Sequence, residues 1–227
     1  MAVLEPLRLV LFDLDGTLVD TAPEIADAVN DTLAQCDLPL VHQQQVNDWI
    51  GHGTRTLLIA ALASAQGRTV EAVRADPDLP RIAGIFDTHY QQRCGTRSQP
   101  FPHVVPVLRS LRECGIRLAV VTNKEARYTD TVLHAHGLHT RFDAVVSGDT
   151  LPTKKPDPGG VLHCLTRLGF TAAQALFVGD SSIDAATARN AGVAVWLLPY
   201  GYNMGQPVTA CQPDRVIPDV RDILRLL

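Results

Sequence analysis

Short runs of apolar residues recur along the chain and mostly lack polar alternation. Such runs are typical of strands that are buried on both faces of a parallel sheet. From Pro102 onward they alternate with segments of helical length, which predicts an α/β fold with a Rossmann-like, doubly wound parallel sheet. The predicted strands are Leu7–Phe12, Leu118–Val121, Ala144–Val146, Leu176–Val178, Val193–Leu198 and Arg215–Ile217, and the predicted helices between them include Val104–Cys114, Ala126–His136, Gly160–Leu168 and Asp184–Asn190.

Residues 21–99 break this alternation, because they contain no run typical of a buried strand. Apolar residues such as Ile25 and Val29 recur there at the spacing of one helix face. Thr21 and Glu24 fit a capping box that opens the first of these helices. The pattern predicts an inserted, all-helical domain. The expected division is an α/β core domain of residues 1–20 and 100–227 and a helical cap domain of residues 21–99.

Composition and charge exclude several classes of function. With 227 residues, of which 46% are hydrophobic and 19% charged, the chain has the balance of a globular protein. Its net charge of −4 does not favour a surface for nucleic acid. Uncharged apolar stretches such as Ala191–Pro199 are far shorter than the ~20 residues of a membrane span, and Leu9–Phe12 is too short for a signal peptide. Five scattered cysteines without a C-x-x-C motif predict reduced thiols in a cytoplasmic protein.

Two pairs of carboxylates follow predicted strands. Asp13 and Asp15 come directly after the first apolar run, and Asp180 and Asp184 follow the run that ends at Val178. Carboxylates at a buried strand end are costly unless a charged group binds between them. Mg²⁺ takes one or two carboxylates and leaves other positions for water and phosphate. A carboxylate can also attack phosphorus while a second one moves protons. The alternatives are a calcium loop, whose later acidic ligands are missing here, and simple turns with helix caps.

A hydroxyl and a lysine follow two further strands. Thr122 and Asn123 come after the run that ends at Val121, where a hydroxyl and backbone amides suit a phosphate, although both residues are also common helix caps. Lys155 precedes a proline and could present its charge to phosphate, or lie on a solvated surface. In open α/β sheets, ligands bind at the carboxyl ends of the strands. A magnesium site with a phosphate cradle is therefore the simplest account of all four strand ends, and it predicts phosphoryl transfer.

This set of residues resembles the four motifs of the haloacid dehalogenase superfamily over essentially the whole chain. The resemblance implies a core of that superfamily's fold, with the helical insertion as a mobile cap. It also implies that Asp13 is a nucleophile that becomes an aspartyl-phosphate, with Asp15 as general acid and base. The matching residues are Asp13-x-Asp15-Gly16-Thr17, then Thr122, then Lys155-Pro156, and then Gly179-Asp180-x-x-x-Asp184.

The same resemblance assigns the binding roles. It implies that Mg²⁺ is held by carboxylate oxygens of Asp13 and Asp180 and by the backbone carbonyl of Asp15. Thr122 and Lys155 would hold the phosphoryl oxygens. Asp184 would orient Lys155 or a metal-bound water from behind.

Within the superfamily, the chain is most similar to bacterial phosphoglycolate phosphatases. Trp49–Gly53 is similar to their substrate-facing cap loop, Leu151–Pro156 to their third motif, and Tyr200–Asn203 to a stretch common among them, although it also reads as a turn. His52 and Ile183 stand where asparagine is usual. Arg55 could meet a substrate carboxylate, or be a solvated helix residue. The expected substrate-binding residues are Thr122, Asn123, Lys155, Gly51, His52, Gly53 and Arg55.

We therefore predict a Mg²⁺-dependent phosphatase of a small phosphomonoester, with 2-phosphoglycolate as the first candidate substrate. A phosphosugar mutase, a pyrophosphatase and a phosphatase of an amino-sugar phosphate fit the same motifs. A binding module without catalysis would be expected to lack a motif carboxylate, and none is missing. The expected partner is a small phosphorylated metabolite, with no nucleic acid and no membrane. A monomer or a small homo-oligomer is expected.

Overall fold

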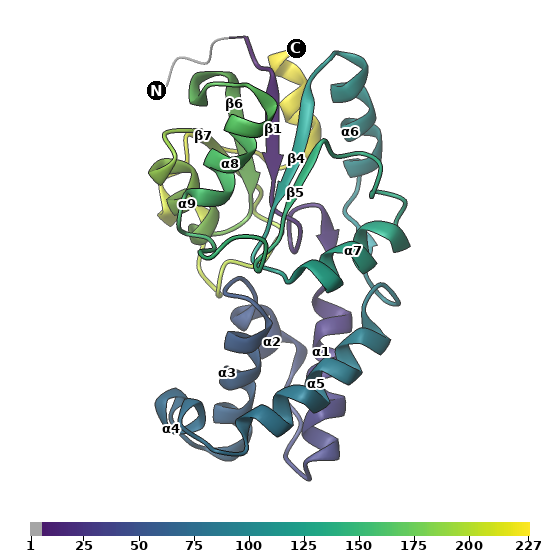
Figure 1. Cartoon of the computed structure of the whole chain (residues 1–227), viewed down its shortest axis with the longest axis vertical. Coiled ribbons are helices and arrows are strands. Elements are labelled where there is room, and N and C mark those ends of the chain that lie inside the picture. The colour runs from purple at the N-terminus through teal and green to yellow at the C-terminus, as the bar shows by residue number, and fades with distance from the viewer. Residues whose placement is uncertain (1–5) are drawn as a thin grey trace.

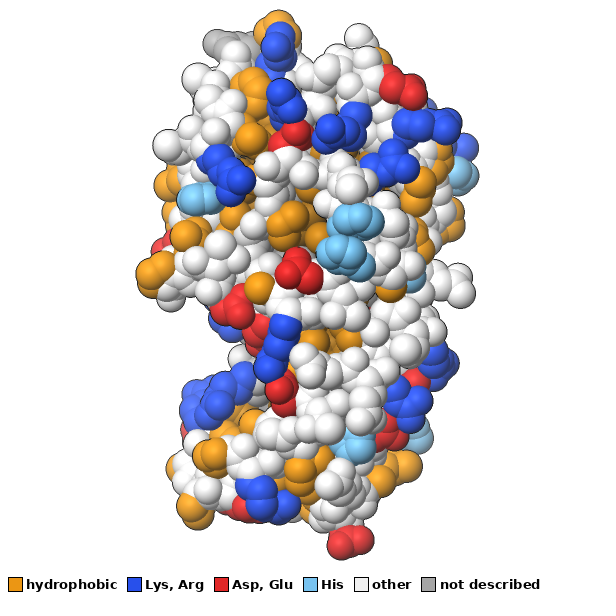
Figure 2. Space-filling view, turned by 45° about the vertical axis from the view of Figure 1, so that its right-hand side comes forward, with side chains coloured by type: hydrophobic (Ala, Val, Ile, Leu, Met, Phe, Trp, Pro, Cys, Tyr) orange, Lys and Arg blue, Asp and Glu red, His pale blue; other side chains and the backbone are white. Residues whose placement is uncertain are grey.

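The computed structural model describes residues 6–227, which form two bodies stacked along the long axis (Figure 1). One is a parallel sheet with helices on both faces, here called the sheet body, and the other consists of helices α1–α5, here called the helical body. Acidic and basic side chains are interspersed over both bodies on the face shown in Figure 2. Within residues 6–227, no helix has the length and apolar character needed to cross a membrane.

The sheet has six strands in the order β5-β4-β1-β6-β7-β8, and every neighbouring pair is parallel. The chain leaves the central strand β1 toward both edges, so a topological switch point lies beside β1, where ligands bind in such sheets. The predicted α/β fold is confirmed, and each predicted strand is present within two residues. The strands are β1 (Leu9–Phe12), β4 (Arg117–Val121), β5 (Ala144–Val146), β6 (Ala175–Gly179), β7 (Ala194–Leu197) and β8 (Arg215–Val216).

Alternate residues of β1 face two separate hydrophobic clusters. Val10 and Phe12 belong to the cluster that includes residues of α6 and α7, and Leu9 and Leu11 belong to the one that includes residues of α8 and α9. All four side chains have no exposed surface. Burial on both faces explains why the strand is a continuous apolar run. The helices are α6 (Val104–Glu113), α7 (Ala126–Ala135), α8 (Gly159–Leu168) and α9 (Ser182–Asn190), and short 3₁₀ turns lie at Ala172–Gln174, Val208–Cys211 and Val220–Leu226.

Helices fill the segment between the first two strands of the main sheet, as the sequence pattern predicts. The long helices α1 and α5 lie side by side, α2 and α3 pack on one side of them, and α4 packs against α3 (Figure 1). Apolar residues at helical spacing, such as Ile25, Val29 and Leu33, are buried between these helices. The helices are α1 (Ala22–Gln35), α2 (Gln43–Trp49), α3 (Thr54–Gln66), α4 (Val70–Arg74) and α5 (Leu79–Arg93).

The two chain connections between the bodies pair with each other. Strand β2 (Val19–Asp20) and strand β3 (Gln99–Pro100) form a short antiparallel ladder. The predicted capping box is wrong, because Thr21 caps nothing with its side chain and instead donates to Asp15. Glu24 reaches away from α1 and accepts hydrogen bonds from the backbone N–H groups of residues 95 and 98 at 2.8 and 3.0 Å. Glu24 thus ties the start of α1 to the second connection.

Candidate active site

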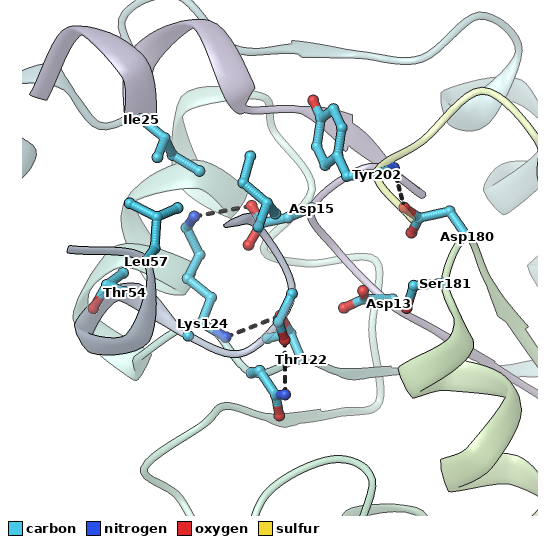
Figure 3. Close-up of a pocket in the computed structure, with 14 residues that line it drawn as sticks. Asp13, Asp15, Ile25, Thr54, Leu57, Thr122, Lys124, Asp180, Ser181 and Tyr202 are labelled. Atoms are coloured by element: carbon cyan, nitrogen blue, oxygen red, sulfur yellow. Dashed lines mark hydrogen bonds and ion pairs between the residues drawn. The ribbon is translucent and has the colours of Figure 1, made fainter. Parts of the chain in front are cut away.

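A pocket lies where the carboxyl ends of β1, β4 and β6 face the helical body (Figure 3). The space open to the centre of a water molecule is about 30 Å³, so the pocket suits a small ligand. Both bodies contribute to its wall. The residues that line it are Asp13, Asp15, Ile25, Ile50, Gly51, Gly53, Thr54, Leu57, Thr122, Asn123, Lys124, Asp180, Ser181 and Tyr202.

Asp13 directly follows β1 and is almost fully buried at the pocket floor. Its Oδ1 atom accepts a hydrogen bond from the Leu14 backbone N–H at 2.7 Å and lies 2.8 Å from Nζ of Lys155. Burial raises the pKa of Asp13 to about 7, Lys155 opposes this rise, and repulsion from Asp184 adds to it. Within residues 6–227, no protein group donates a hydrogen bond to the second carboxylate oxygen, which leaves it available to a ligand.

Asp180 follows β6 and lies across the pocket floor from Asp13. The Thr17 hydroxyl donates to its Oδ1 at 2.5 Å, and the Tyr202 backbone N–H donates to its Oδ2 at 2.6 Å. Burial raises the pKa of Asp180 well above its ordinary value, and the carboxylates of Asp184 and Asp13 add to the rise. Two hydrogen bonds therefore fix this carboxyl group in an environment that disfavours its charge.

Two glycines allow the backbone to approach Asp180 closely. A Cβ atom on Gly16, which has a φ of 86°, would lie 2.4 Å from Oδ2 of Asp180. A Cβ atom on Gly201 would lie 2.2 Å from the same oxygen and 2.4 Å from the carbonyl oxygen of Gly16. The segment around Tyr202 is therefore more than a turn. It closes over Asp180, and the Tyr202 hydroxyl accepts the Ala22 backbone N–H at 3.1 Å, at the start of α1.

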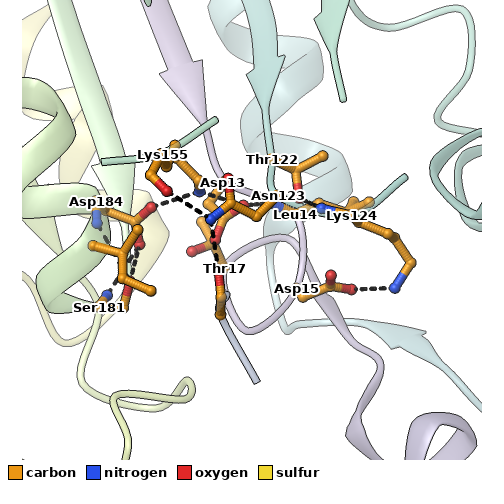
Figure 4. A network of polar contacts seen from close by, with 12 residues as sticks. Asp13, Leu14, Asp15, Thr17, Thr122, Asn123, Lys124, Lys155, Ser181 and Asp184 are labelled. Carbon is orange, nitrogen blue, oxygen red and sulfur yellow. Dashed lines mark hydrogen bonds and ion pairs between the residues drawn. The ribbon is translucent and has the colours of Figure 1, made fainter. Parts of the chain in front are cut away.

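Lys155 is held between two carboxylates (Figure 4). Its Nζ atom lies 2.8 Å from Asp13 and 2.7 Å from Asp184. Burial lowers the pKa of Lys155, but the charges of Asp13 and Asp184 raise it above the ordinary value. Lys155 is therefore an ammonium. The other oxygen of Asp184 accepts from the Ser181 hydroxyl at 2.7 Å and from the backbone N–H groups of Asp180 and Ser181 at 3.1 Å. Asp184 thus holds the Lys155 ammonium through an ion pair and is itself fixed by these donors.

The carboxylates present fit a hard divalent cation. Asp13, Asp180 and Asp184 each offer an oxygen within 4.8 Å of the others. Because both oxygens of Asp184 are occupied by Lys155 and by the donors around Ser181, Asp13 and Asp180 are the carboxylates with capacity for an ion. Three carboxyl groups face one ammonium in this buried cluster, so a cation would offset an excess of negative charge. Oxygen ligands of this kind suit Mg²⁺.

Thr122 and Asn123 follow β4, as predicted, and both line the pocket. The Thr122 hydroxyl accepts the backbone N–H of Lys124 at 3.2 Å, and it can still donate its own proton to an anion. The side-chain amide of Asn123 donates to the carbonyl oxygens of Gly51 at 2.9 Å and of Lys155 at 3.0 Å. Asn123 therefore joins the loop of the helical body to the lysine of the sheet body.

The loop before α3 contributes its backbone to the pocket. Gly51 and Gly53, with φ angles of 128° and 90°, line the pocket as predicted. The carbonyl oxygen of His52 accepts a hydrogen bond from Lys154 at 2.7 Å, but the side chain of His52 is exposed and does not line the pocket. Arg55 is also exposed and lies outside the lining. The structure thus brings the two glycines, and not these two side chains, to the predicted site.

One charged group of the site has no predicted role in the sequence. The side chain of Lys124 is 1% exposed, and its Nζ atom donates to Asp15 at 2.9 Å and to the hydroxyl of Tyr90. Burial opposes the charge of Lys124, but Asp15 raises its pKa above the ordinary value. Its place directly after Asn123, at a strand end, is the one signal that could have revealed it. Tyr90 lies inside α5, where its sequence neighbours give no such signal.

The sequence matches the haloacid dehalogenase-like hydrolases over residues 10–198. The chain belongs to the haloacid dehalogenase-like hydrolase family. A phosphoglycolate phosphatase of Vibrio cholerae is 36% identical over 224 residues, which cover 99% of this chain and 98% of that protein. A phosphoglycolate phosphatase of Haemophilus influenzae is 38% identical over 220 residues, which cover 97% and 98%. The crystal structure of a predicted phosphoglycolate phosphatase from Haemophilus somnus has a TM-score of 0.90 and 34% identity and covers 98% of each chain.

This haloacid dehalogenase-like hydrolase is a phosphatase that acts on phosphoric monoesters. The relatives that match it over nearly their whole length are named phosphoglycolate phosphatases. The buried ammonium of Lys155 lies 2.8 Å from the carboxylate of Asp13, and Thr122 lines the pocket beside it.

Proposed function

We propose that this protein is a Mg²⁺-dependent phosphatase that hydrolyses 2-phosphoglycolate to glycolate and phosphate. The observation that carries the proposal is the pair of carboxyl groups, Asp13 and Asp180, on the floor of a small pocket, with the Lys155 ammonium 2.8 Å from Asp13. The phosphoglycolate phosphatases of Vibrio cholerae and Haemophilus influenzae, at 36% and 38% identity, support the choice of substrate. The narrow pocket favours a leaving group of few atoms.

The first step is the transfer of the phosphoryl group to Asp13. A carboxylate oxygen of Asp13 attacks phosphorus, the bond between phosphorus and the ester oxygen breaks, and Asp15 gives the leaving oxygen its proton. An aspartyl-phosphate forms on Asp13, and glycolate leaves. In the second step, Asp15 takes a proton from water, which attacks phosphorus and releases Asp13 and inorganic phosphate. The protons and charges balance, because Asp15 donates one proton and recovers one.

The other residues bind and orient the phosphoryl group. Lys155 and Thr122 hold its oxygens and stabilise the charge of the transition state. Asp184 keeps Lys155 in place through the 2.7 Å contact. Mg²⁺ would be held by Asp13, Asp180 and the backbone carbonyl of Asp15, and when bound it supplies further neutralisation of phosphoryl charge.

The helical body acts as a cap in this proposal. Residues 21–99 form the cap domain, and residues 6–20 with 100–227 form the described part of the core domain. The loop of the cap is docked by hydrogen bonds from Asn123 and Lys154, and Thr54 donates to Glu125 at 2.7 Å. A cap in this position excludes bulk water from the reacting phosphoryl group.

Phosphate release from a set of small phosphoesters, measured with and without Mg²⁺, tests the proposal. The set contains 2-phosphoglycolate, pyrophosphate, β-glucose 1-phosphate and an amino-sugar 6-phosphate. We expect release that requires Mg²⁺ and is fastest with 2-phosphoglycolate. Fastest release from another member would contradict 2-phosphoglycolate as the substrate. Equal release with and without Mg²⁺ would contradict the proposed need for the metal. Rearrangement of the sugar phosphate without release would establish a mutase instead.

A further inference from the structure

Lys124 is the one cationic residue among the described residues that line the pocket. Its ammonium group lies beside Asp15 and the apolar side chains of Ile25 and Leu57, at the wall formed by the helical body (Figure 3). Lys155 approaches the site from the opposite side, where it contacts Asp13 (Figure 4). The site therefore has one cation at each end, and only the second of them has a role in holding the phosphoryl group.

The ammonium of Lys124 has capacity for one more acceptor. An ammonium carries three N–H donors, and within residues 6–227 the structure gives Nζ two acceptors, Asp15 and the Tyr90 hydroxyl. The side chain is 1% exposed, so bulk water has little access to the third donor. Buried charged donors are normally fully hydrogen-bonded. A ligand in the pocket is the group that can accept from it.

We propose that Lys124 binds a carboxylate on the leaving group and thereby selects phosphomonoesters whose leaving group is a short hydroxy acid. This inference rests on the proposed function and assigns a specificity residue to it. A substrate with a phosphoryl group at one end and a carboxylate at the other matches the two cations. The small pocket places the two anionic groups of the substrate a few bonds apart. A neutral leaving group offers no anion to the buried ammonium, so its ester binds less well.

Tyr90 makes this recognition depend on both bodies. Lys124 belongs to the sheet body, whereas Tyr90 belongs to α5 and has no exposed surface. The ammonium donates to the Tyr90 hydroxyl and lies 5.1 Å from the centre of its ring, so the helical body holds it in position. Tyr90 is a positioning residue here, because the charge that recognises the carboxylate is that of Lys124.

Two esters that differ only in the carboxylate test the role of Lys124. These are 2-phosphoglycolate and 2-hydroxyethyl phosphate, compared by kcat/KM in the wild type and in Lys124→Met. We expect the wild type to prefer the carboxylate by about 100-fold, the size of effect typical of a buried charge pair, and Lys124→Met to lose most of that preference. Tyr90→Phe removes one acceptor that positions the same ammonium but keeps the charge. It should weaken the preference less than Lys124→Met does.

Binding of phosphonates provides a readout that needs no turnover. 3-Phosphonopropionate keeps the carboxylate and cannot be hydrolysed, and propylphosphonate lacks the carboxylate. Their effects on the melting temperature should differ in the wild type and become similar in Lys124→Met. If Lys124→Met does not fold, Lys124→Gln replaces it, because its amide can still donate to Asp15 and Tyr90.

The outcomes separate this inference from the proposed function. A wild type that shows no preference in either pair of compounds would overturn the role of Lys124 and leave phosphatase chemistry intact. Equal losses for both esters in Lys124→Met would overturn it too, because they would show that Lys124 only positions Asp15. If no ester is hydrolysed, the proposed function fails, and the phosphonate pair still decides whether Lys124 recognises a carboxylate.

Discussion

Asp13 and Asp184 contact the ammonium of Lys155, and the carboxyl group of Asp180 lies close to theirs, in a part of the molecule that water hardly reaches. Such a cluster is suited to binding cations and phosphate, but it opposes folding when no ligand compensates the charge. The raised pKa values of Asp13 and Asp180 are the direct sign of this opposition. The residues proposed to serve the reaction therefore cost stability in the metal-free protein.

Replacement of Asp13 by Asn separates activity from stability. Asp13→Asn removes the proposed nucleophile, so turnover should fall by at least about 10³-fold. It also removes one buried charge from the cluster, so the metal-free variant should unfold at a higher temperature. A gain of 1 kcal/mol corresponds to about 2–4 °C for a chain of this size, which calorimetry without divalent cations resolves.

Asp143→Asn is the matched control for this substitution. Asp143 lies 2.7 Å from Arg117 and accepts a hydrogen bond from the Leu118 backbone N–H at 3.0 Å, and its pKa is lowered. Loss of this carboxylate should therefore lower the melting temperature and spare turnover. An Asp13→Asn protein that melts below the wild type would contradict the view that the site is strained by charge.

At the scale of elements, Glu24 joins helix α1 to the connection that returns to the sheet. Glu24→Ala removes the acceptor of the backbone N–H groups of Gly95 and Ser98, both of which it now binds within 3.0 Å. We expect a loss of about 2–3 kcal/mol in the free energy of unfolding, because buried N–H groups are left without an acceptor. Amide hydrogen exchange should accelerate at residues 95–98. Chemical unfolding and exchange mass spectrometry measure the two effects.

Asp27→Ala is the control on the same helix. Asp27 also reaches the second connection, through an ion pair with Arg97 at 2.7 Å, but the Arg97 side chain is 58% exposed. Exposed ion pairs contribute little, so this variant should lose less than about 1 kcal/mol. If the two variants behave alike, the buried carboxylate of Glu24 has no special role in the connection.

Features set by local sequence patterns were predictable, whereas contacts of α1 with distant parts of the chain were not. Strands were predictable, because burial on both faces makes each one a continuous apolar run, as in β1. The carboxylates of the site were predictable, because strand ends of one sheet meet at one edge. The capping box failed because Thr21 and Glu24 bind partners outside their helix, Asp15 and the second connection. Such partners depend on tertiary packing, which a local pattern does not contain.

The contacts across the two bodies were hidden for the same reason. Lys124 and Tyr90 meet only when α5 of the helical body lies against the loop that follows β4, and the sequence around neither residue indicates this contact. His52 and Arg55 were predicted to bind the substrate, but their side chains are exposed. Their loop lines the pocket with its two glycines instead. A motif thus located the loop but did not say which of its atoms face the ligand.

At the scale of the whole molecule, protons and a cation compete for the same buried carboxylates. In the metal-free fold, burial raises the pKa of Asp13 from 3.8 to about 7, so the folded protein holds a proton that the unfolded chain releases. The stability from this proton is complete below a pH of about 3.8 and is lost as the pH rises through about 7. The pKa of Asp180 is also raised, so its contribution to stability likewise decreases as the pH rises.

Stabilisation by Mg²⁺ should therefore increase with pH. A cation that binds only the folded protein raises its stability by mass action, and above pH ~7 it no longer has to displace protons. The rise in melting temperature caused by saturating MgCl₂ should be larger at pH ~8 than at pH ~5, measured by calorimetry in matched ionic strength. Asp13→Asn should flatten this dependence, because one of the two proposed carboxylate ligands is then lost. An equal shift at both pH values would mean that Mg²⁺ binds elsewhere, at groups that do not titrate in this range.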